Sequence, residues 1–254
     1  MIAVISPAKT LDFETAHEGN FTSPRFQKET VRLAKTLKKK KEKDLKSLMN
    51  ISDALAALNV DRYQNFSGDE NAKISRPAIH AFKGDVYIGL AAESLSNEAL
   101  DFAQDHLRIL SGLYGVLRPL DLIEPYRLEM GTKLKIGKYE NLYQFWGGKI
   151  AKELSKDLKE NGSDIILNLA SKEYFKSVNK KELKGRIIDV EFKDFSNDKY
   201  KIISFFAKKA RGLMSRYMID HQITDPEKLK GFDMEGYYFV DSESTEDSYI
   251  FHRG

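Results

Sequence analysis

The chain of 254 residues contains no cysteine. Without a thiol it cannot form disulfide bonds, a thiolate nucleophile, iron–sulfur clusters or cysteine-ligated zinc sites. Its five histidines are dispersed, and no pair has the i, i+4 spacing that two metal ligands on one helix require. We therefore expect neither a metal site nor a cofactor, and the lack of cysteine fits a reducing cytoplasm.

Long apolar runs are also missing. None approaches the roughly 20 residues that a membrane-spanning helix needs, and the start of the sequence, MIAVIS, lacks the basic segment of a secretory signal. Hydrophobic residues make up 41% of the chain and charged residues 31%, which is typical of a folded soluble protein. The sequence therefore predicts a cytoplasmic protein that does not contact membranes. A formal charge of +3 implies nucleic acid only if the cations cluster locally.

The chain contains neither a Walker loop nor a GxGxxG motif. The Ser-x-x-Lys spacing of a serine acyl-enzyme occurs at Ser6–Lys9, but it recurs at Ser196–Lys199 within a turn. Because the spacing occurs twice, it is a weak signal, and we interpret Lys9 as an anion contact.

Two short apolar runs, Met1–Ile5 and Asp164–Leu169, have the character of buried strands. Serine and lysine follow each run at once, at Ser6 and Lys9 and at Ser171 and Lys172. If both strands belong to one sheet, the two lysines lie at the same edge, where α/β proteins commonly bind ligands.

The remaining elements interleave with these strands. We expect helices at Ser23 to about Leu48, Ser94–Leu110, Asn141–Leu158 and Ala207–Met218, an edge strand at Lys133–Ile136, a hairpin of Ile187–Phe192 with Tyr200–Phe206, and a closing hairpin of Tyr237–Val240 with Tyr249–His252. Such interleaving favours a single mixed α/β (α+β) domain over residues 1–254, with a central sheet and surrounding helices.

The segment Leu110–Gly131 is apolar, yet glycines and prolines prevent a long helix or strand from crossing it. It carries several charged or phenolic residues: Arg118, Asp121, Glu124, Tyr126, Arg127 and Glu129. Because burying an unpaired charge is costly, one interpretation is that these groups satisfy one another and fix the loop. The other is that Arg118, Tyr126 and Arg127 face a cleft and hold an anion.

Residues 45–58 read as a helix, a tight turn and a second helix. Asn50 tolerates the left-handed conformation that ends a helix, and Ser52 can cap the next. This arrangement resembles a helix–hairpin–helix, whose turn can grip a DNA phosphate. The usual glycines of that motif are missing, so an ordinary helical hairpin remains an alternative.

Cations accumulate outside these elements as well. In the expected helix Ala207–Met218, Lys208, Arg211 and Ser215 share one face, and no acidic residue lies between Lys199 and Asp220. A plain solvated face is possible, but unpaired cations at a helix start also suit phosphate. The full set of candidate phosphate or DNA contacts is Lys9, Arg118, Arg127, Lys172, Lys176, Lys208, Lys209, Arg211 and Arg216.

Seven colinear segments between Ile5 and about Tyr238 resemble the YaaA family of bacterial peroxide-stress proteins. They are ISPAKTLDF, LMNISDALAALN, FKGDVY, HLRILSGLYGVLRPLDLIEPYRLEMG, LYQFWG, NLASKEYFKSV and FFAKKARGLMSRY. The resemblance implies a cytoplasmic protein that limits free iron and DNA damage during exposure to hydrogen peroxide. It also implies a mixed α/β fold with a helix–hairpin–helix element and a basic cleft suited to duplex or branched DNA.

Two classes of function follow. The first is a DNA-binding stress protein without turnover, and the family implies no settled reaction. The second is an enzyme acting on a nucleotide or nucleobase in a pocket lined by Lys9, Arg118, Tyr126, Arg127 and Glu129, with Tyr126 and Glu129 as the candidate catalytic groups. We favour the first and leave the question of catalysis open.

Overall fold

The computed structural model describes residues 1–14, 19–68 and 74–254. Its central sheet has the strand order β11-β12-β9-β8-β1-β5-β6, and β10 pairs with β9. Five strands are mutually parallel: β1 (Ile2–Ile5), β5 (Leu107–Ser111), β8 (Ile165–Leu169), β9 (Arg186–Phe195) and β12 (Ser248–Arg253). The antiparallel strands are β6 (Gly115–Leu117), β10 (Tyr200–Lys201) and β11 (Tyr237–Phe239). Two small ribbons pair β2 (Thr10–Leu11) with β4 (Phe82–Lys83), and β3 (Arg76–Pro77) with β7 (Leu122–Ile123).

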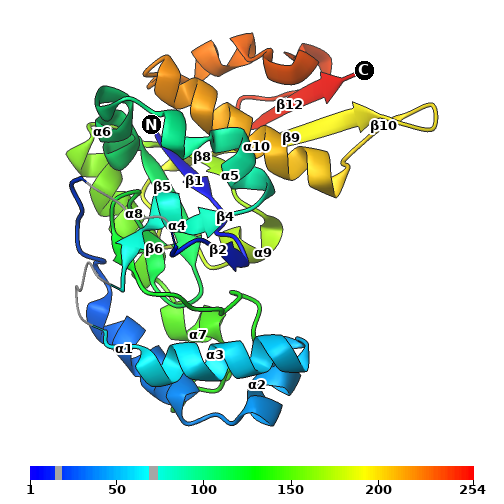
Figure 1. Ribbon diagram of the computed structural model, residues 1–254. Coiled ribbons are helices and arrows are strands. Elements are labelled where there is room, and N and C mark those ends of the chain that lie inside the picture. The colour runs from blue at the N-terminus through cyan, green and yellow to red at the C-terminus, as the bar shows by residue number, and fades with distance from the viewer. Residues whose placement is uncertain (15–18, 69–73) are drawn as a thin grey trace.

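Helices surround the sheet, and a separate helical layer lies below it in Figure 1. That lower layer consists of α1 (Gln27–Lys38), α2 (Glu42–Met49) and α3 (Asp53–Asn65). The other α-helices are α4 (Ala78–Ala81), α5 (Asp85–Leu90), α6 (Asn97–His106), α7 (Leu142–Trp146), α8 (Lys149–Glu160), α9 (Lys172–Phe175) and α10 (Ser204–Asp220). Short 3-10 helices are η1 (Ala92–Ser94), η2 (Pro226–Gly231), η3 (Met234–Gly236) and η4 (Asp241–Glu243).

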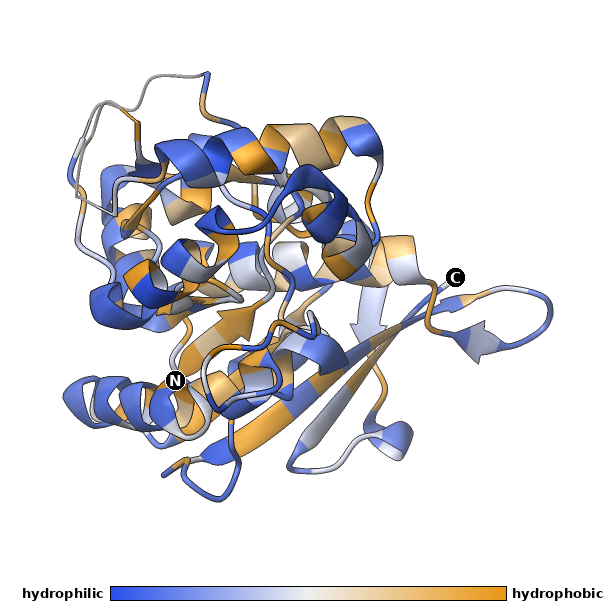
Figure 2. Ribbon diagram, turned by 90° about the horizontal axis from the view of Figure 1, so that it is seen from below, coloured by the Kyte–Doolittle hydropathy of each residue, from blue (hydrophilic) through white to orange (hydrophobic). Residues whose placement is uncertain are grey.

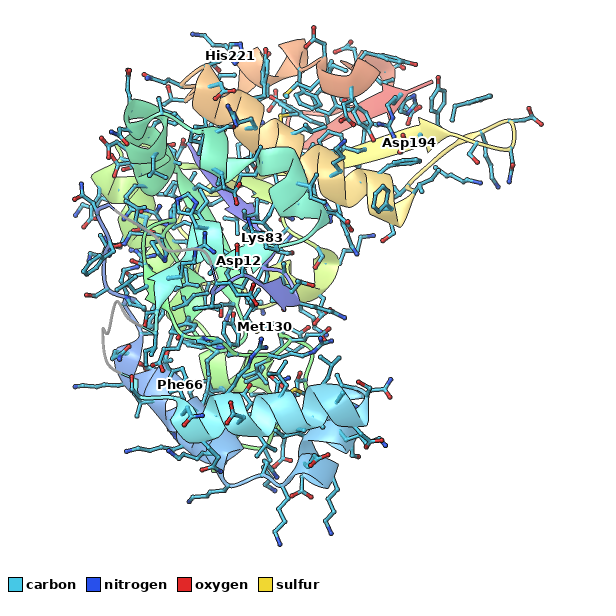
Figure 3. All side chains as sticks on the ribbon, in the orientation of Figure 1. Asp12, Phe66, Lys83, Met130, Asp194 and His221 are labelled. Carbon is cyan, nitrogen blue, oxygen red and sulfur yellow. The ribbon has the colours of Figure 1, made fainter. Side chains whose placement is uncertain are left out.

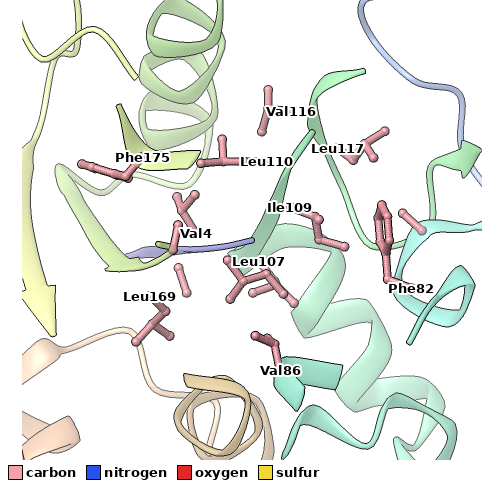
Figure 4. Close-up of a cluster of buried hydrophobic side chains, with 14 of the residues drawn as sticks. Val4, Phe82, Val86, Leu107, Ile109, Leu110, Val116, Leu117, Leu169 and Phe175 are labelled. Atoms are coloured by element: carbon pink, nitrogen blue, oxygen red, sulfur yellow. The ribbon is translucent and has the colours of Figure 1, made fainter. Parts of the chain in front are cut away.

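Strand β1 lies at the centre of the core, and all four of its residues are buried. Figure 4 shows Phe175 and Val116 on one side of this strand and Val86 and Leu169 on the other. Apolar residues follow the strands of the sheet, whereas the outer helices are mostly polar on their exposed faces (Figure 2). Burial on both faces explains why β1 is a continuous apolar run, whereas β9 alternates because it buries every second side chain.

Helices α5 and α10 cross at two glycines. A Cβ atom on Gly212 would lie 1.8 Å from the carbonyl oxygen of Val86, and one on Gly89 would lie 2.3 Å from that of Lys209. Only glycine permits this approach. The contact fixes α10 against the sheet and thereby fixes the positions of the cations that α10 carries.

The expected fold class, a mixed α/β architecture with a central sheet and surrounding helices, is confirmed. None of the helices in the described ranges is long and apolar enough to cross a bilayer. The hairpin around Asn197 and Asp198 is present, with both residues at positive φ, but its second strand is only Tyr200–Lys201 because α10 begins at Ser204. The closing hairpin is β11 with β12.

The prediction of one helix over Ser94–Leu110 is wrong at its C-terminal end. Ser96 caps α6 as expected by accepting the N–H of Ala99 at 3.1 Å, but α6 ends at His106 and Leu107–Ser111 is the central strand β5. Buried residues on both faces of a parallel strand read like the continued apolar face of a helix, so periodicity could not separate the two elements.

Three further boundaries differ from expectation. The helix expected from Ser23 starts at Gln27 and ends at Lys38. A separate helix, α2, starts at Glu42, and its residue Asp44 caps it by accepting the N–H of Lys41 at 3.0 Å. The helix expected over Asn141–Leu158 breaks at Gly147, whose φ is 51°. Lys133–Ile136 is not a strand: Leu134 and Ile136 are buried as the alternation indicates, but the only bridge there joins Ile136 to Tyr139 in the described structure.

The helix–turn–helix over residues 45–58 is observed as the end of α2, a short turn and the start of α3. Asn50 is left-handed, and Ser52 accepts the N–H of Leu55 at 3.3 Å. However, the first residue of α3, Asp53, forms an ion pair with Lys46 at 2.6 Å. A carboxylate therefore lies in the first turn of α3, where its charge disfavours a DNA phosphate at the helix N-terminus.

Candidate functional site: two polar clusters at the end of the sheet

Strands β8, β1 and β5 are adjacent and parallel, so their carboxyl ends meet at one edge of the sheet. The chain departs from β1 to β5 on one side and later adds β8 on the other, which makes this edge a topological switch point. Ser6 follows β1, and its hydroxyl oxygen accepts the N–H of Ser171, after β8, at 2.9 Å. The segments that carry Lys9 and Lys172 thus lie at the same edge, as the sequence predicted.

Tyrosines fill the space beneath this edge. Ser111, at the end of β5, shares a 2.6 Å hydrogen bond with the hydroxyl of Tyr126 and accepts the N–H of Tyr114 at 2.9 Å. Tyr63 of α3 donates to the carbonyl of Arg127 at 2.5 Å. Burial raises the pKa values of Tyr63, Tyr114 and Tyr126 far above the usual tyrosine range, so their hydroxyls stay protonated and act as structural hydrogen-bonding groups.

Glu129 joins two of the predicted anion contacts. Its carboxylate lies 2.8 Å from the ammonium of Lys9 and 3.2 Å from the guanidinium of Arg127. The next residue, Met130, is fully buried and lies between α3 and the sheet layer in Figure 3. Arg62 of α3 is nearby: burial lowers its pKa, and the charge of Arg127 lowers it further. The structure therefore brings together Lys9, Tyr126, Arg127 and Glu129, but with the two cations already paired to a carboxylate.

Arg118 lies apart from that group. Its guanidinium contacts the buried carboxylate of Asp121 at 3.0 Å and the carbonyl of Ser23 at 3.2 Å. Glu124 is likewise satisfied, because it accepts the backbone N–H groups of Ser67 and Gly68 at 2.9 and 2.7 Å. These contacts correspond to the interpretation in which the charges of Leu110–Gly131 fix the loop.

Three of the four α10 cations are also paired, two of them with carboxylates supplied by other elements. Lys208 lies 3.7 Å from Asp85 of α5, and Lys209 pairs with Glu235. Arg216 pairs with Asp220 at 2.7 Å, near the end of its own helix. The sequence between Lys199 and Asp220 contains no acidic residue and so suggested that these cations are unpaired. Two of the three partners, Asp85 and Glu235, come from distant parts of the chain.

The other three candidates, Lys172, Lys176 and Arg211, form no ion pair with any described residue, and all three line one groove of about 520 Å³. A second groove of about 410 Å³ adjoins it, since both include Lys176, Val178 and Lys180. The second groove adds Lys181 and Tyr143. We call these two adjoining grooves together the basic groove. The cations that line it are Lys172, Lys176, Lys180, Lys181 and Arg211.

The groove exists because β9 is longer than its neighbour. Strand β8 pairs with β9 only as far as Asn168 opposite Asp189, whereas β9 continues to pair with β12 as far as Asp194 opposite Arg253. The notch beyond the end of β8 is closed by α9 and its following loop on one side and by α10 on the other. Parallel strands of unequal length thus create a cavity at the carboxyl edge, where ligands commonly bind in α/β proteins.

The sequence analysis did not identify three further cations near these sites: Lys180, Lys181 and Arg62. The segment Lys176–Lys184 is rich in lysine and directly follows a strand-to-helix turn, and this pattern was the available signal for the first two. Arg62 carried no such signal, because its approach to Arg127 depends on how α3 packs against the sheet layer. Within residues 1–14, 19–68 and 74–254, no three His, Asp or Glu side chains are arranged to hold a metal ion.

A protein-family model and full-length relatives match this chain over nearly all of its sequence. The family model for the peroxide stress protein YaaA matches residues 1–243. A UPF0246 protein from Aliivibrio fischeri (strain ATCC 700601 / ES114) is 52% identical over 254 residues, covering 100% of this chain and 98% of that protein. A UPF0246 protein from Polaromonas naphthalenivorans (strain CJ2) is 52% identical over 255 residues, covering 100% and 99%. The chain therefore belongs to the YaaA family of peroxide stress proteins.

Proposed function

We propose that this protein binds DNA through the basic groove and protects it during peroxide stress. The proposal rests on which of the nine predicted cations are paired with carboxylates and which are not. Six of the nine are matched by carboxylates, and the three that are not lie together in one groove. Unmatched cations gathered on one surface are the usual footprint of a phosphate backbone.

The lysines of the basic groove suit a sequence-independent contact. Lys172, Lys176, Lys180 and Lys181 are exposed, and a lysine ammonium acts on phosphate as a point charge without fixed geometry. Lys176 lies 5.0 Å from the ring centroid of Tyr143, and Lys180 lies 5.8 Å from that of Phe175, so aromatic faces hold both lysines along the groove. Such contacts position a protein on DNA without reading bases.

The α2–α3 turn makes a poorer phosphate site. Asp53 stands at the N-terminus of α3, and its partner Lys46 is thereby occupied. The negative charge of Asp53 in the first turn of α3 repels a phosphate that approaches the α3 amides. For this reason the proposal rests on the basic groove and not on the helical hairpin.

The enzymatic alternative has less support. Tyr126 is 4% exposed and bonded to Ser111, and both oxygens of Glu129 contact a cation. A general acid or base must reach its substrate proton. The arrangement favours binding without turnover.

The test is fluorescence anisotropy with a short labelled duplex. Lys176→Ala/Lys181→Ala should weaken binding by about tenfold, since each lost phosphate contact is worth roughly 0.5–1 kcal/mol at moderate salt. The matched control, Lys159→Ala/Lys228→Ala, removes two exposed lysines that have no ion pair in the described structure and lie outside the groove. Equal weakening by both pairs would show only a net-charge effect and would contradict the proposal.

We also propose, from family membership, that the protein limits free iron and DNA damage when cells meet hydrogen peroxide. In cells that lack the protein, the parent chain should lower DNA strand breakage after peroxide, whereas Lys176→Ala/Lys181→Ala should not. Full protection by the variant would separate the stress function from the groove. Whole-cell electron paramagnetic resonance measures the free iron in the same cultures.

A further inference from the structure

Arg211 is the unusual member of the basic groove. Its side chain is mostly enclosed, yet it forms no ion pair with a described residue, and its Nε–H has no hydrogen-bond acceptor. Burial lowers the pKa of Arg211, and the nearby charge of Glu191 only partly opposes that effect. A desolvated guanidinium without a bound partner reduces the stability of the folded protein.

The cavity around Arg211 is larger than a lone phosphate needs. Its volume of about 520 Å³ lies within the range of small-molecule sites. Its apolar wall consists of Phe175, Val178, Val190, Phe192, Ile202 and Ala207. A ligand that fills the cavity therefore has an anionic end and a body that can lie against apolar side chains.

The cavity also contains hydrogen-bond acceptors. Asp189 and Glu191 lie on its β9 wall, and Asp189 already accepts the amide N–H of Asn168 at 2.6 Å. Free carboxylate lone pairs accept hydrogen bonds from hydroxyl or amino groups. Four cations line the same cavity as these two carboxylates, so an anion is still favoured: Lys172, Lys176, Lys180 and Arg211.

We propose that this cavity binds a single nucleotide. The 5′-phosphate contacts Arg211 with help from the lysines at the rim, the sugar hydroxyl or a base amino group donates to Asp189 or Glu191, and the base lies on the apolar wall. Arginine suits this role because its fork donates two parallel hydrogen bonds to phosphate oxygens. The inference deepens the proposed function and rests on it in one respect: bound DNA supplies the nucleotide from a strand end, while the other source is a free nucleoside monophosphate.

The test is isothermal titration calorimetry of the full chain with deoxyadenosine 5′-monophosphate, deoxyadenosine and inorganic phosphate. The monophosphate should bind with a Kd below about 1 mM, and both fragments should bind at least about tenfold more weakly. Arg211→Met, which keeps the aliphatic stem, should weaken monophosphate binding by about tenfold or more. Lys208→Met changes an exposed lysine of the same helix, paired to Asp85, and should leave the affinity unchanged.

Two readouts separate folding, DNA binding and the nucleotide site. The midpoint temperature of thermal unfolding of Arg211→Met should equal or exceed that of the parent, because the substitution removes an unpaired, mostly buried charge. A covalently closed duplex, which has no strand ends, should still bind this variant because the four exposed lysines of the groove remain, whereas a duplex with a 5′-phosphorylated overhang should lose its advantage over the 5′-hydroxyl form. If the parent chain binds the closed duplex but does not bind the monophosphate and shows no preference for the 5′-phosphorylated end, this inference is overturned and the proposed function stands. Failure of all DNA to bind overturns the proposed function itself.

Discussion

Ser6 and Ser171 lie 165 positions apart in the sequence, yet Ser6 Oγ accepts the backbone N–H of Ser171 at 2.9 Å and donates to its hydroxyl at 3.3 Å. This contact joins the end of β1 to the end of β8 and fixes the start of α9. The segment that begins there carries Lys172 and Lys176. The geometry of the basic groove thus depends on a pair of neutral hydroxyl groups.

Ser6→Ala should therefore loosen the groove without removing any charge. The substitution leaves the N–H of Ser171 without an acceptor, and we expect the free energy of unfolding to fall by about 1–2 kcal/mol. Urea denaturation measures this loss. Ser204→Ala, at an exposed position with no side-chain hydrogen bond in the described structure, is the control and should stay within about 0.5 kcal/mol of the parent. A parent-like stability of Ser6→Ala would show that the two strand ends are held by other contacts.

Arg118→Ala should affect stability and not DNA. The substitution leaves the fully buried Asp121 with fewer partners, and we expect a loss of about 2 kcal/mol in denaturant unfolding. DNA affinity, measured by anisotropy at a temperature at which the variant is folded, should stay within about twofold of the parent value. A large loss of affinity at unchanged stability would make Arg118 a DNA contact, as the second interpretation of its loop supposes.

Asp157 should make the protein sensitive to acid. Its carboxylate lies 2.6 Å from both Arg108 and Arg25 in the buried layer under α8. Burial alone would raise the pKa of Asp157, but the hydrogen bond and charge of Arg108, with Arg25, lower it below its usual value. A depressed carboxyl pKa adds stability above the unfolded value of about 3.9, and that stability is lost as the pH falls through the folded value.

Chemical denaturation between pH 7 and pH 3 tests this pair. The stability of the parent should fall steeply below about pH 4, while Asp157→Asn should already be less stable by about 3 kcal/mol at pH 7 and should fall less on acidification. Parallel pH profiles for the two proteins would contradict the role assigned to Asp157.

Glu129→Gln should strengthen DNA binding. Glu129 holds both Lys9 and Arg127, and its neutral analogue frees two cations at the carboxyl edge of the sheet. If these cations then reach phosphate, the slope of log K against log salt steepens by up to about 0.9 for each new contact. Anisotropy at several salt concentrations gives this slope. An unchanged slope would place Lys9 and Arg127 outside the path of DNA.

Local chemistry predicted much of the fold. The buried strands, the cap at Ser96, the left-handed Asn50 and the Asn197–Asp198 turn follow from side-chain types within a few residues of one another. The missed strand β5 did not, because a strand buried on both faces carries no alternation to distinguish it from a helix.

Some features of the candidate site could likewise be predicted from local sequence, and others could not. The sequence placed Lys9 and Lys172 at one edge because a strand that ends in a polar turn is a local feature. It could not show which cations are free, since Asp85 and Glu235 reach Lys208 and Lys209 from distant segments. Nor could it predict the groove, which arises from the unequal lengths of β8 and β9.

The most direct test of the account is the salt dependence of DNA binding for Lys176→Ala/Lys181→Ala beside the parent and the Lys159→Ala/Lys228→Ala control. If the basic groove contacts phosphate, the slope of log K against log salt becomes shallower by about 1.8 in the groove variant, because two phosphate contacts are lost, and stays at the parent value in the control. Equal slopes in all three proteins would contradict the assignment of DNA binding to this groove.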